Sequence, residues 1–128
     1  FHLFCHEDAE EAVRIARDPL NRYLRSLVDA ASEWTAGADS ADYPGYDKII
    51  AGLAEQDFEK QVASASAWVG TPEQILEQVR EYDARIGGFE HASLQVNFNT
   101  LARADAEASM RRFAREVMPY AKGARRDA

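Results

Sequence analysis

The side chains best suited to binding chemistry lie in the stretch HASLQVNFN, near the C-terminal end of the sequence. Gln95, Asn97 and Asn99 recur at every second position, so in an extended strand they would share one face. Each carries an amide group that both donates and accepts hydrogen bonds, which suits contact with a small-molecule ligand. The alternative interpretation is structural, with these residues forming a polar lining of the fold or a helix cap.

Two histidines and the single cysteine lie near the N-terminus. His2 and His6 would lie on one face of a strand over residues 1–6, about 13 Å apart at ~3.3 Å per residue. That separation is too large for one metal ion, so we predict no metal site. His6, at the carboxyl end of the strand, joins the three amide residues as a candidate ligand contact, with ordinary packing or exposure as the alternative. We expect Cys5 to be a small buried hydrophobe.

Nothing in the sequence predicts hydrolytic chemistry. Ser64, Ser66 and Ser93 lack the strained turn and the paired base that activate a serine nucleophile. Trp34 and Trp68 are expected to pack in the core rather than stack on a ligand. The sequence therefore yields binding candidates but no catalytic residue.

The composition is that of one ordinary globular domain over residues 1–128, with 46% hydrophobic and 29% charged residues and a net charge of −7. Nucleic-acid binders carry a basic patch, and only the tail KGARRDA is basic, so we expect residues 122–128 to be a flexible end and no nucleic acid to bind. No apolar run approaches the ~20 residues of a membrane helix, so no membrane association is expected. A lone cysteine excludes an intramolecular disulfide and favours the cytoplasm.

Strands and helices that alternate along the chain must position the candidates. The first strand, over residues 1–6, leads into a helix opened by a capping box of Asp8 and Glu11. Pro19 falls inside this helix and predicts a kink or break near Asp18. The apolar stripe of this helix recurs at spacings of three and four. It comprises Val13, Ala16, Leu20, Leu24, Leu27, Ala31 and Trp34.

The second half of the chain predicts the same alternation. A loop through AGADSADYPGY is followed by a helix over DKIIAGLAEQDFEKQVA, interrupted at Gly52, and by a short strand, SAWV. Thr71 is expected to cap a helix that begins at Pro72, with Gln74 completing a capping box and Gly87-Gly88 ending it.

A last strand over residues 91–98 and a last helix follow. Strands that alternate with helices indicate an α/β fold with parallel strands. Two or three strands make a thin sheet with exposed edges, which indicates part of a larger assembly. The last helix should end near Met118, before Pro119. Its expected buried residues are Ala106, Met110, Phe113, Ala114, Val117 and Met118.

The order of these features resembles the C-terminal portion of the luciferase-like flavin-dependent monooxygenases, the family of bacterial luciferase. The resemblance lies in the helix start VGTPEQ, the strand around Gln95, and the ending FAREVMP. FHLFCHED is similar to the seventh barrel strand of that family, and YPGYDKII stands where its members carry a mobile segment. The resemblance implies a lid-like loop over residues 36–50 and a fragment of a TIM (β/α)8 barrel, which as a whole takes ~250 residues.

The same resemblance implies a function. In the family, reduced FMN binds at the barrel mouth and, with O2, oxidises a small organic substrate such as an aldehyde, while some relatives use a deazaflavin and a flavin reductase can supply the cofactor. Within residues 91–98, Ser93, Gln95 and Asn97 would face the barrel lumen, and the four alternating apolar side chains would pack under the helices. The family's catalytic residues lie upstream of this segment, so the isolated fragment is expected to be inactive and to bind no FMN.

A different class of protein is the alternative. The chain could be a stand-alone, non-catalytic α/β module that self-associates through open sheet edges. Either interpretation predicts a homo-oligomer, since a thin sheet with exposed edges can hide them by pairing with another copy.

Overall fold

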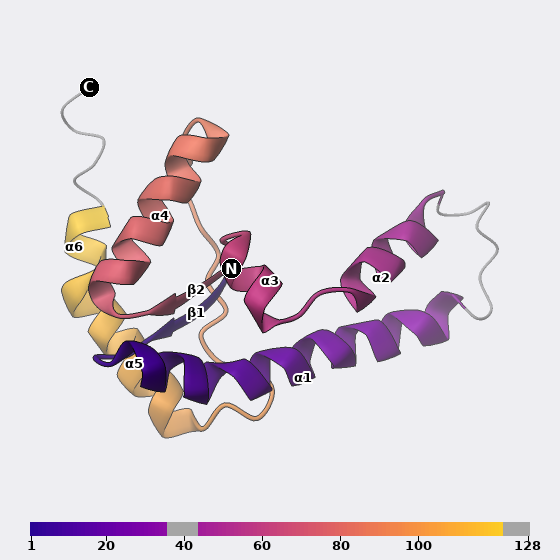
Figure 1. Ribbon diagram of the computed structural model, residues 1–128, viewed down its shortest axis with the longest axis horizontal. Coiled ribbons are helices and arrows are strands. Elements are labelled where there is room, and N and C mark those ends of the chain that lie inside the picture. Colours follow the sequence, from indigo (N-terminus) through magenta and orange to yellow (C-terminus); the bar gives the residue numbers. More distant parts are fainter. Residues whose placement is uncertain (36–43, 122–128) are drawn as a thin grey trace.

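The computed structural model describes residues 1–35 and 44–121 (Figure 1). Within these residues the protein is a small, mostly helical α/β domain with a two-stranded parallel sheet, which confirms the predicted α/β class. The elements, in chain order, are β1 (His2–Cys5), α1 (Ala9–Thr35), α2 (Tyr46–Ala54), α3 (Phe58–Ala63), β2 (Ala67–Gly70), α4 (Pro72–Ile86), α5 (Arg103–Glu116) and α6 (Met118–Ala121).

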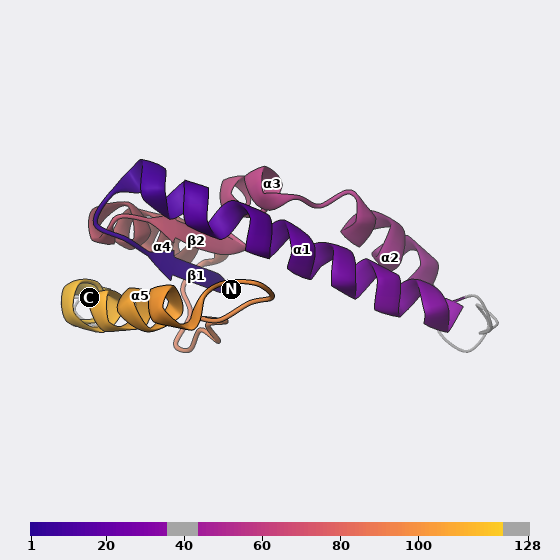
Figure 2. The ribbon, with the colours of Figure 1, turned by 90° about the horizontal axis from the view of Figure 1, so that it is seen from below.

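The sheet lies between two layers of helices. β1 pairs with β2 in parallel, with His2 opposite Ala67 and Cys5 opposite Gly70. Because side chains alternate along a strand, Phe4 packs against α1 while Leu3 and Cys5 pack against α4 and α5. Figure 2 shows α1 and α5 on opposite sides of the strands, so the sheet is covered on both faces.

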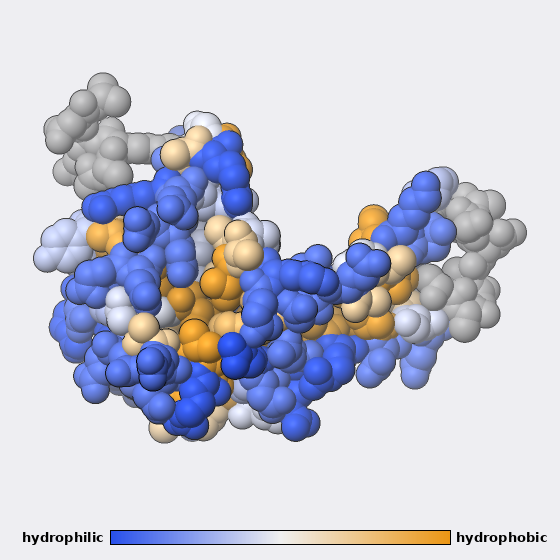
Figure 3. All heavy atoms as spheres, in the orientation of Figure 1, coloured by the Kyte–Doolittle hydropathy of each residue, from blue (hydrophilic) through white to orange (hydrophobic). Residues whose placement is uncertain are grey.

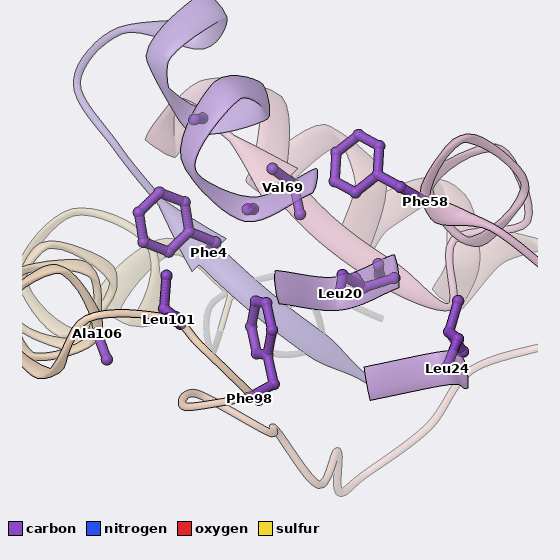
Figure 4. Close-up of a cluster of buried hydrophobic side chains, with 11 residues drawn as sticks. Phe4, Leu20, Leu24, Phe58, Val69, Phe98, Leu101 and Ala106 are labelled. Atoms are coloured by element: carbon purple, nitrogen blue, oxygen red, sulfur yellow. The ribbon is translucent and has the colours of Figure 1, made fainter. Parts of the chain in front are cut away.

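The larger core cluster joins α1 and α3 to one face of the sheet. Figure 4 shows the side chains of Phe4, Leu20, Phe58, Val69 and Phe98 pointing toward one another in this cluster, and all five are buried. Burying a Leu or Phe side chain stabilises a fold by about 1.5–3 kcal/mol. This cluster therefore holds α1 against the sheet.

The predicted break at Pro19 is wrong, because α1 runs without interruption from Ala9 to Thr35. A proline inside a helix costs about 3 kcal/mol, and the burial of Leu20 and Leu24 in the core cluster offsets a penalty of that size. The predicted N-cap is confirmed, since the main-chain N–H of Glu11 donates to the Asp8 carboxylate at 2.9 Å. The reciprocal half of the predicted capping box is not formed, because the N–H of Asp8 donates to His6 and the Glu11 carboxylate pairs with Arg14. The side chain of Trp34 lies outside the described residues.

The region between α1 and β2 differs in detail from the prediction. Gly52 lies inside α2, and the interruption falls instead before α3, where the Asp57 side chain accepts from the N–H of Lys60. Of the predicted lid-like loop, residues 36–43 lie outside the described residues, and residues 46–50 form the start of α2. The tail over residues 122–128 also lies outside them.

The strand predicted over residues 91–98 is not formed. Only an isolated parallel bridge joins Gln95 to His2 in the described structure. The physical reason lies in β1. The main-chain N–H of Cys5, with which a longer strand would have to pair, already donates to the Ser109 hydroxyl of α5. The chain then turns away, and Asn99 adopts a left-handed backbone with φ 50°.

The bridge also sets the lateral order of the sheet. The N–H of His2 bonds Ser66 on the β2 side, so the next N–H, that of Leu3, points away from β2 and donates to Gln95. The Gln95 segment therefore lies on the opposite side of β1 from β2. In a (β/α)8 barrel, consecutive strands are neighbours, which would place this segment beside β2.

The start and end of α4 match the prediction. The N–H of Gln74 donates to the Thr71 hydroxyl, the N–H of Thr71 donates to the Gln74 side chain at 3.0 Å, and Pro72 is the first helical residue. Gly87 ends the helix in the left-handed conformation, with φ 79°. All of these contacts join residues close in sequence, which is why the sequence predicted them.

The buried side of α5 is narrower than predicted. Ala106 and Val117 are buried as expected, but Met110 is 41% exposed and Met118 is 37% exposed. Between Ala106 and Val117 the helix also buries a polar residue, Ser109, which is only 1% exposed. The helix ends at Glu116, and Pro119 lies in the short helix α6.

The cap of α4 gives a direct stability prediction. Thr71→Ala should lower the free energy of unfolding by about 1 kcal/mol, because a helix-terminal N–H loses its partner. Thr71→Ser keeps the hydroxyl and should change it much less. Urea denaturation of the three proteins measures the difference, and equal midpoints for the Ala variant and the parent would show that the Thr71 hydroxyl does not stabilise the helix.

Candidate functional site

The carboxyl end of the parallel sheet is where a ligand site is expected. In open α/β sheets, ligands bind beyond the carboxyl ends of the strands, where neighbouring connections leave toward opposite faces. β1 leads into α1 on one face, and β2 leads into α4 on the other. The region is therefore defined by His6, which follows β1, and by Thr71, which follows β2.

His6 lies at this end, as predicted, but its ring serves the turn into α1. The N–H of Asp8 donates to His6 Nδ1 at 3.0 Å, and the imidazole stacks on Phe4 with ring centroids 6.4 Å apart. The ring thus shapes the start of α1, which satisfies the structural alternative without testing the ligand role.

The three amide residues lie elsewhere. Gln95 lies beside the start of β1, where its main-chain N–H donates to Phe1 and its carbonyl accepts from Leu3. Asn97 is exposed, and Asn99 donates from Nδ2 to the Ser26 hydroxyl at 3.4 Å. Ser26 lies 17 residues beyond the start of α1, or about 25 Å along the helix. The structure therefore does not bring these residues and His6 into one site.

His2 and Trp68 are packing residues in the structure. The His2 ring meets Tyr23 and Phe98 edge-on at 4.8 and 5.3 Å, and burial lowers the pKa of His2 below its ordinary value. Trp68 is 2% exposed and stacks on Phe1 at 4.3 Å. The prediction that Trp68 packs in the core is confirmed.

Two residues that the sequence did not single out complete the carboxyl end of β1. The Ser109 hydroxyl accepts a hydrogen bond from the main-chain N–H of Cys5 at 2.8 Å, in a buried environment. Arg112, one turn further along α5, forms an ion pair with Glu7 at 3.2 Å. Ser109 could have been noticed as a polar residue three positions after the buried Ala106 of the same helix.

Burial determines the chemistry of Cys5. It raises the pKa of the thiol to about 11, with Arg112 acting in the opposite direction and Glu116 and Glu73 adding to the rise. A thiol at such a pKa is protonated at neutral pH and is a poor nucleophile. Cys5 is therefore the buried hydrophobe that the sequence predicted.

The charges around the carboxyl end do not suit a phosphate group. Glu7, Asp8 and Glu73 follow the two strands. Arg112 approaches the same end, but its guanidinium is paired with Glu7. A flavin phosphate needs unpaired cations or free helix-terminal N–H groups. The described residues at this end of the sheet therefore do not fit the phosphate of FMN.

Two open hollows flank α4. One, of about 370 Å³, is lined by residues that include Glu73, Arg115 and Tyr120. The other, of about 340 Å³, follows the free edge of β2 and includes Val69 and Gln78. Across residues 1–35 and 44–121, no group of three or more His, Cys, Asp or Glu side chains is placed to hold a metal ion. None of the described helices has the length and apolar character needed to cross a membrane.

Comparisons with family models, with curated proteins and with solved structures gave no match.

The Cys5–Ser109 hydrogen bond predicts the effect of a mutation. Ser109→Ala should lower the free energy of unfolding by about 1–3 kcal/mol, because a buried N–H is left without a partner. The amide proton of Cys5 should also exchange faster. Ser93→Ala, at an exposed position, is the matched control and should change stability little. Unchanged protection of the Cys5 amide in the Ser109 variant would contradict this role.

The pKa of Cys5 predicts how stability depends on pH. Between pH 9 and about 11 the unfolded chain loses the thiol proton while the folded chain keeps it, so the free energy of unfolding should fall with rising pH. The slope due to this one group is at most about 1.4 kcal/mol per pH unit. Cys5→Ala removes the effect, so the difference in stability between parent and variant should shrink across this range. Parallel pH profiles would contradict the raised pKa.

Proposed function

We propose that this chain is the C-terminal part of a luciferase-like, FMN-dependent monooxygenase, in which it supplies scaffold rather than catalytic groups. The observation that supports this most is the junction VGTPEQ. It ends β2 at Gly70, caps α4 with Thr71 and starts the helix at Pro72, as the resemblance implies. The parallel pairing of β1 with β2 and the end of α5 just before VMP are consistent with the same origin.

The division of labour follows from the charges of the site. Since the carboxyl end of the sheet is acidic and Arg112 is paired, the FMN phosphate must be held by other parts of the proposed enzyme. The small organic substrate, and a flavin reductase where one takes part, would likewise meet the whole enzyme. The contribution of this chain would be the βα units that complete the barrel wall.

The TIM barrel itself is part of the proposal, and it makes a strict demand on topology. In a closed barrel the Gln95 segment must pair with β2, whereas here it bridges β1 at His2. A structure of the full-length protein decides between the two arrangements. A Gln95 segment that stays on the β1 side in the full-length protein would exclude the barrel.

A second candidate is a non-catalytic module that self-associates. The observation that favours it is the arm formed by α2 and the C-terminal half of α1, which projects from the body of the molecule (Figures 1 and 3). α2 has no buried residue, and Ile49 on it is 66% exposed. Leu27 and Tyr46 add partly exposed apolar surface to the same arm. A homo-oligomer, most simply a dimer with two-fold symmetry, would cover this surface.

The two candidates are separated by flavin binding. The chain alone should give no saturable quenching of FMN fluorescence at micromolar protein, because the described carboxyl end of its sheet does not suit a phosphate. The product of the complete open reading frame should bind FMN and consume O2 when reduced flavin and a long-chain aldehyde are supplied. The complete frame should add ~200 residues upstream, which gives a total within the range of about 200 to more than 400 residues for barrels with insertions.

Two outcomes contradict the enzyme proposal. One is an open reading frame that begins just before Phe1, and the other is saturable FMN binding by the chain alone. Sedimentation tests the second candidate, which requires a mass above the 14.3 kDa of one chain. Ile49→Lys on the arm should return that mass to one chain, and Lys48→Ala is a control on the same helix.

A further inference from the structure

The two edges of the sheet differ in how their main-chain groups are hydrogen-bonded, and the outer edge of β1 is fully paired at its N–H groups. The outward N–H of Leu3 donates to the Gln95 carbonyl at 3.0 Å. The next outward N–H, at Cys5, donates to the Ser109 hydroxyl at 2.8 Å. Both outward donors of β1 are therefore satisfied within the chain, so no further strand can pair there.

The outer edge of β2 is closed less completely, since Ala67 is 0% exposed whereas Val69 lines an open groove. Because parallel pairing to β1 uses the main-chain groups of Ser66, Trp68 and Gly70, those of Ala67 and Val69 point outward. The Gln78 side chain of α4 donates from Nε2 to the Val69 carbonyl at 3.1 Å. In the described part of the chain this is the one contact that closes an outward group of β2, and the outward N–H groups have no partner.

Gln78 itself is only half satisfied. Its Oε1 is buried, and no described group donates to it. A primary amide has the same donor and acceptor as a peptide group. Gln78 thus takes the position of a peptide group from a neighbouring strand, while leaving its own acceptor unpaired. An unpaired buried acceptor costs free energy, so Gln78 covers the Val69 carbonyl less well than a strand would.

A groove runs along this edge. Its volume is about 340 Å³, and Val13 of α1, Val62 of α3 and Val69 give it an apolar floor. The charged residues that line it are Glu77 and Glu81, one turn apart on α4. Among the described residues, no cation forms an ion pair with either carboxylate. The groove therefore offers main-chain hydrogen bonds, an apolar floor and a negative wall along one line.

We propose that the outer edge of β2 binds an extended, basic segment of a partner protein as an added strand. The main chain of that segment takes over the Val69 carbonyl from Gln78 and accepts from the outward N–H of Val69. Alternate apolar side chains lie on Val13 and Val62, and Lys or Arg side chains face Glu77 and Glu81. This inference rests on the arrangement in which the Gln95 segment bridges β1, because a closed barrel would pair that segment with the same edge of β2.

Charge argues against a second copy as the occupant. Pairing two β2 edges about a two-fold axis would bring Glu77 and Glu81 of both copies together, in a protein whose net charge is already −7. Like charges placed together in an interface oppose association. A basic strand instead places positive charge beside Glu77 and Glu81, so it attracts these carboxylates.

The test uses a fluorescent, acetylated hexapeptide of alternating Lys and Val, with the matching Glu and Val peptide as control. The Lys peptide should raise fluorescence anisotropy saturably, and the Glu peptide should not. Bound peptide should slow hydrogen exchange at the amide of Val69, while the amide of Leu3, already bonded to Gln95, should not change. A Lys peptide with N-methylated main chain should not bind.

Variants separate the parts of the proposal. Glu77→Gln and Glu81→Gln should each weaken the Lys peptide by about threefold, the scale of one exposed charge pair, while Glu90→Gln, away from the groove, should not. Gln78→Ala frees the Val69 carbonyl and should tighten binding by about fivefold, the scale of one hydrogen bond.

Four outcomes would overturn the proposal. Three are no binding of the Lys peptide, equal binding of the two peptides, and binding without protection at Val69. Protection of Val69 that appears with protein concentration alone, in the absence of peptide, would assign the edge to a second copy and would also overturn it.

Discussion

The hydrogen bond from the Cys5 main chain to the Ser109 hydroxyl is the constraint on which the rest of the arrangement depends. A two-stranded sheet that is buried on both faces has two edges whose main-chain groups need hydrogen-bond partners. Ser109 satisfies one of them and holds α5 against β1. It also stops the Gln95 segment from continuing as a strand, so the chain turns at Asn99 toward α5.

The same requirement explains why the sheet stays small. β1 is closed by Gln95 and Ser109, and β2 is covered at one carbonyl by Gln78. Helices on both faces then bury every residue of β2. The fold gains its stability from the two apolar clusters on either side of the strands, and the difference between a closed edge and a partly covered one marks where another chain can be accepted.

Negative charge dominates both places where a ligand could approach the sheet. The loops that follow β1 and β2 carry carboxylates, and Arg112, which approaches them, is paired with Glu7. The groove beside β2 carries two more carboxylates on α4. Anionic ligands are therefore disfavoured at both places. A scaffold in a larger flavin enzyme and an edge for a basic strand are both compatible with this distribution.

The sequence by itself determined the features that depend on near neighbours. The Asp8 and Thr71 caps, the short strand before Gly70 and the end of α4 at Gly87 were predicted correctly, because each rests on contacts within a few residues. Only the tertiary structure decided the rest. The missing strand over residues 91–98 follows from a bond between positions 104 residues apart, Cys5 and Ser109. The continuity of α1 through Pro19 follows from burial against distant elements. The separation of His6 from Gln95, Asn97 and Asn99 has the same origin, since periodicity gives the face of a strand but not the neighbour with which the strand pairs.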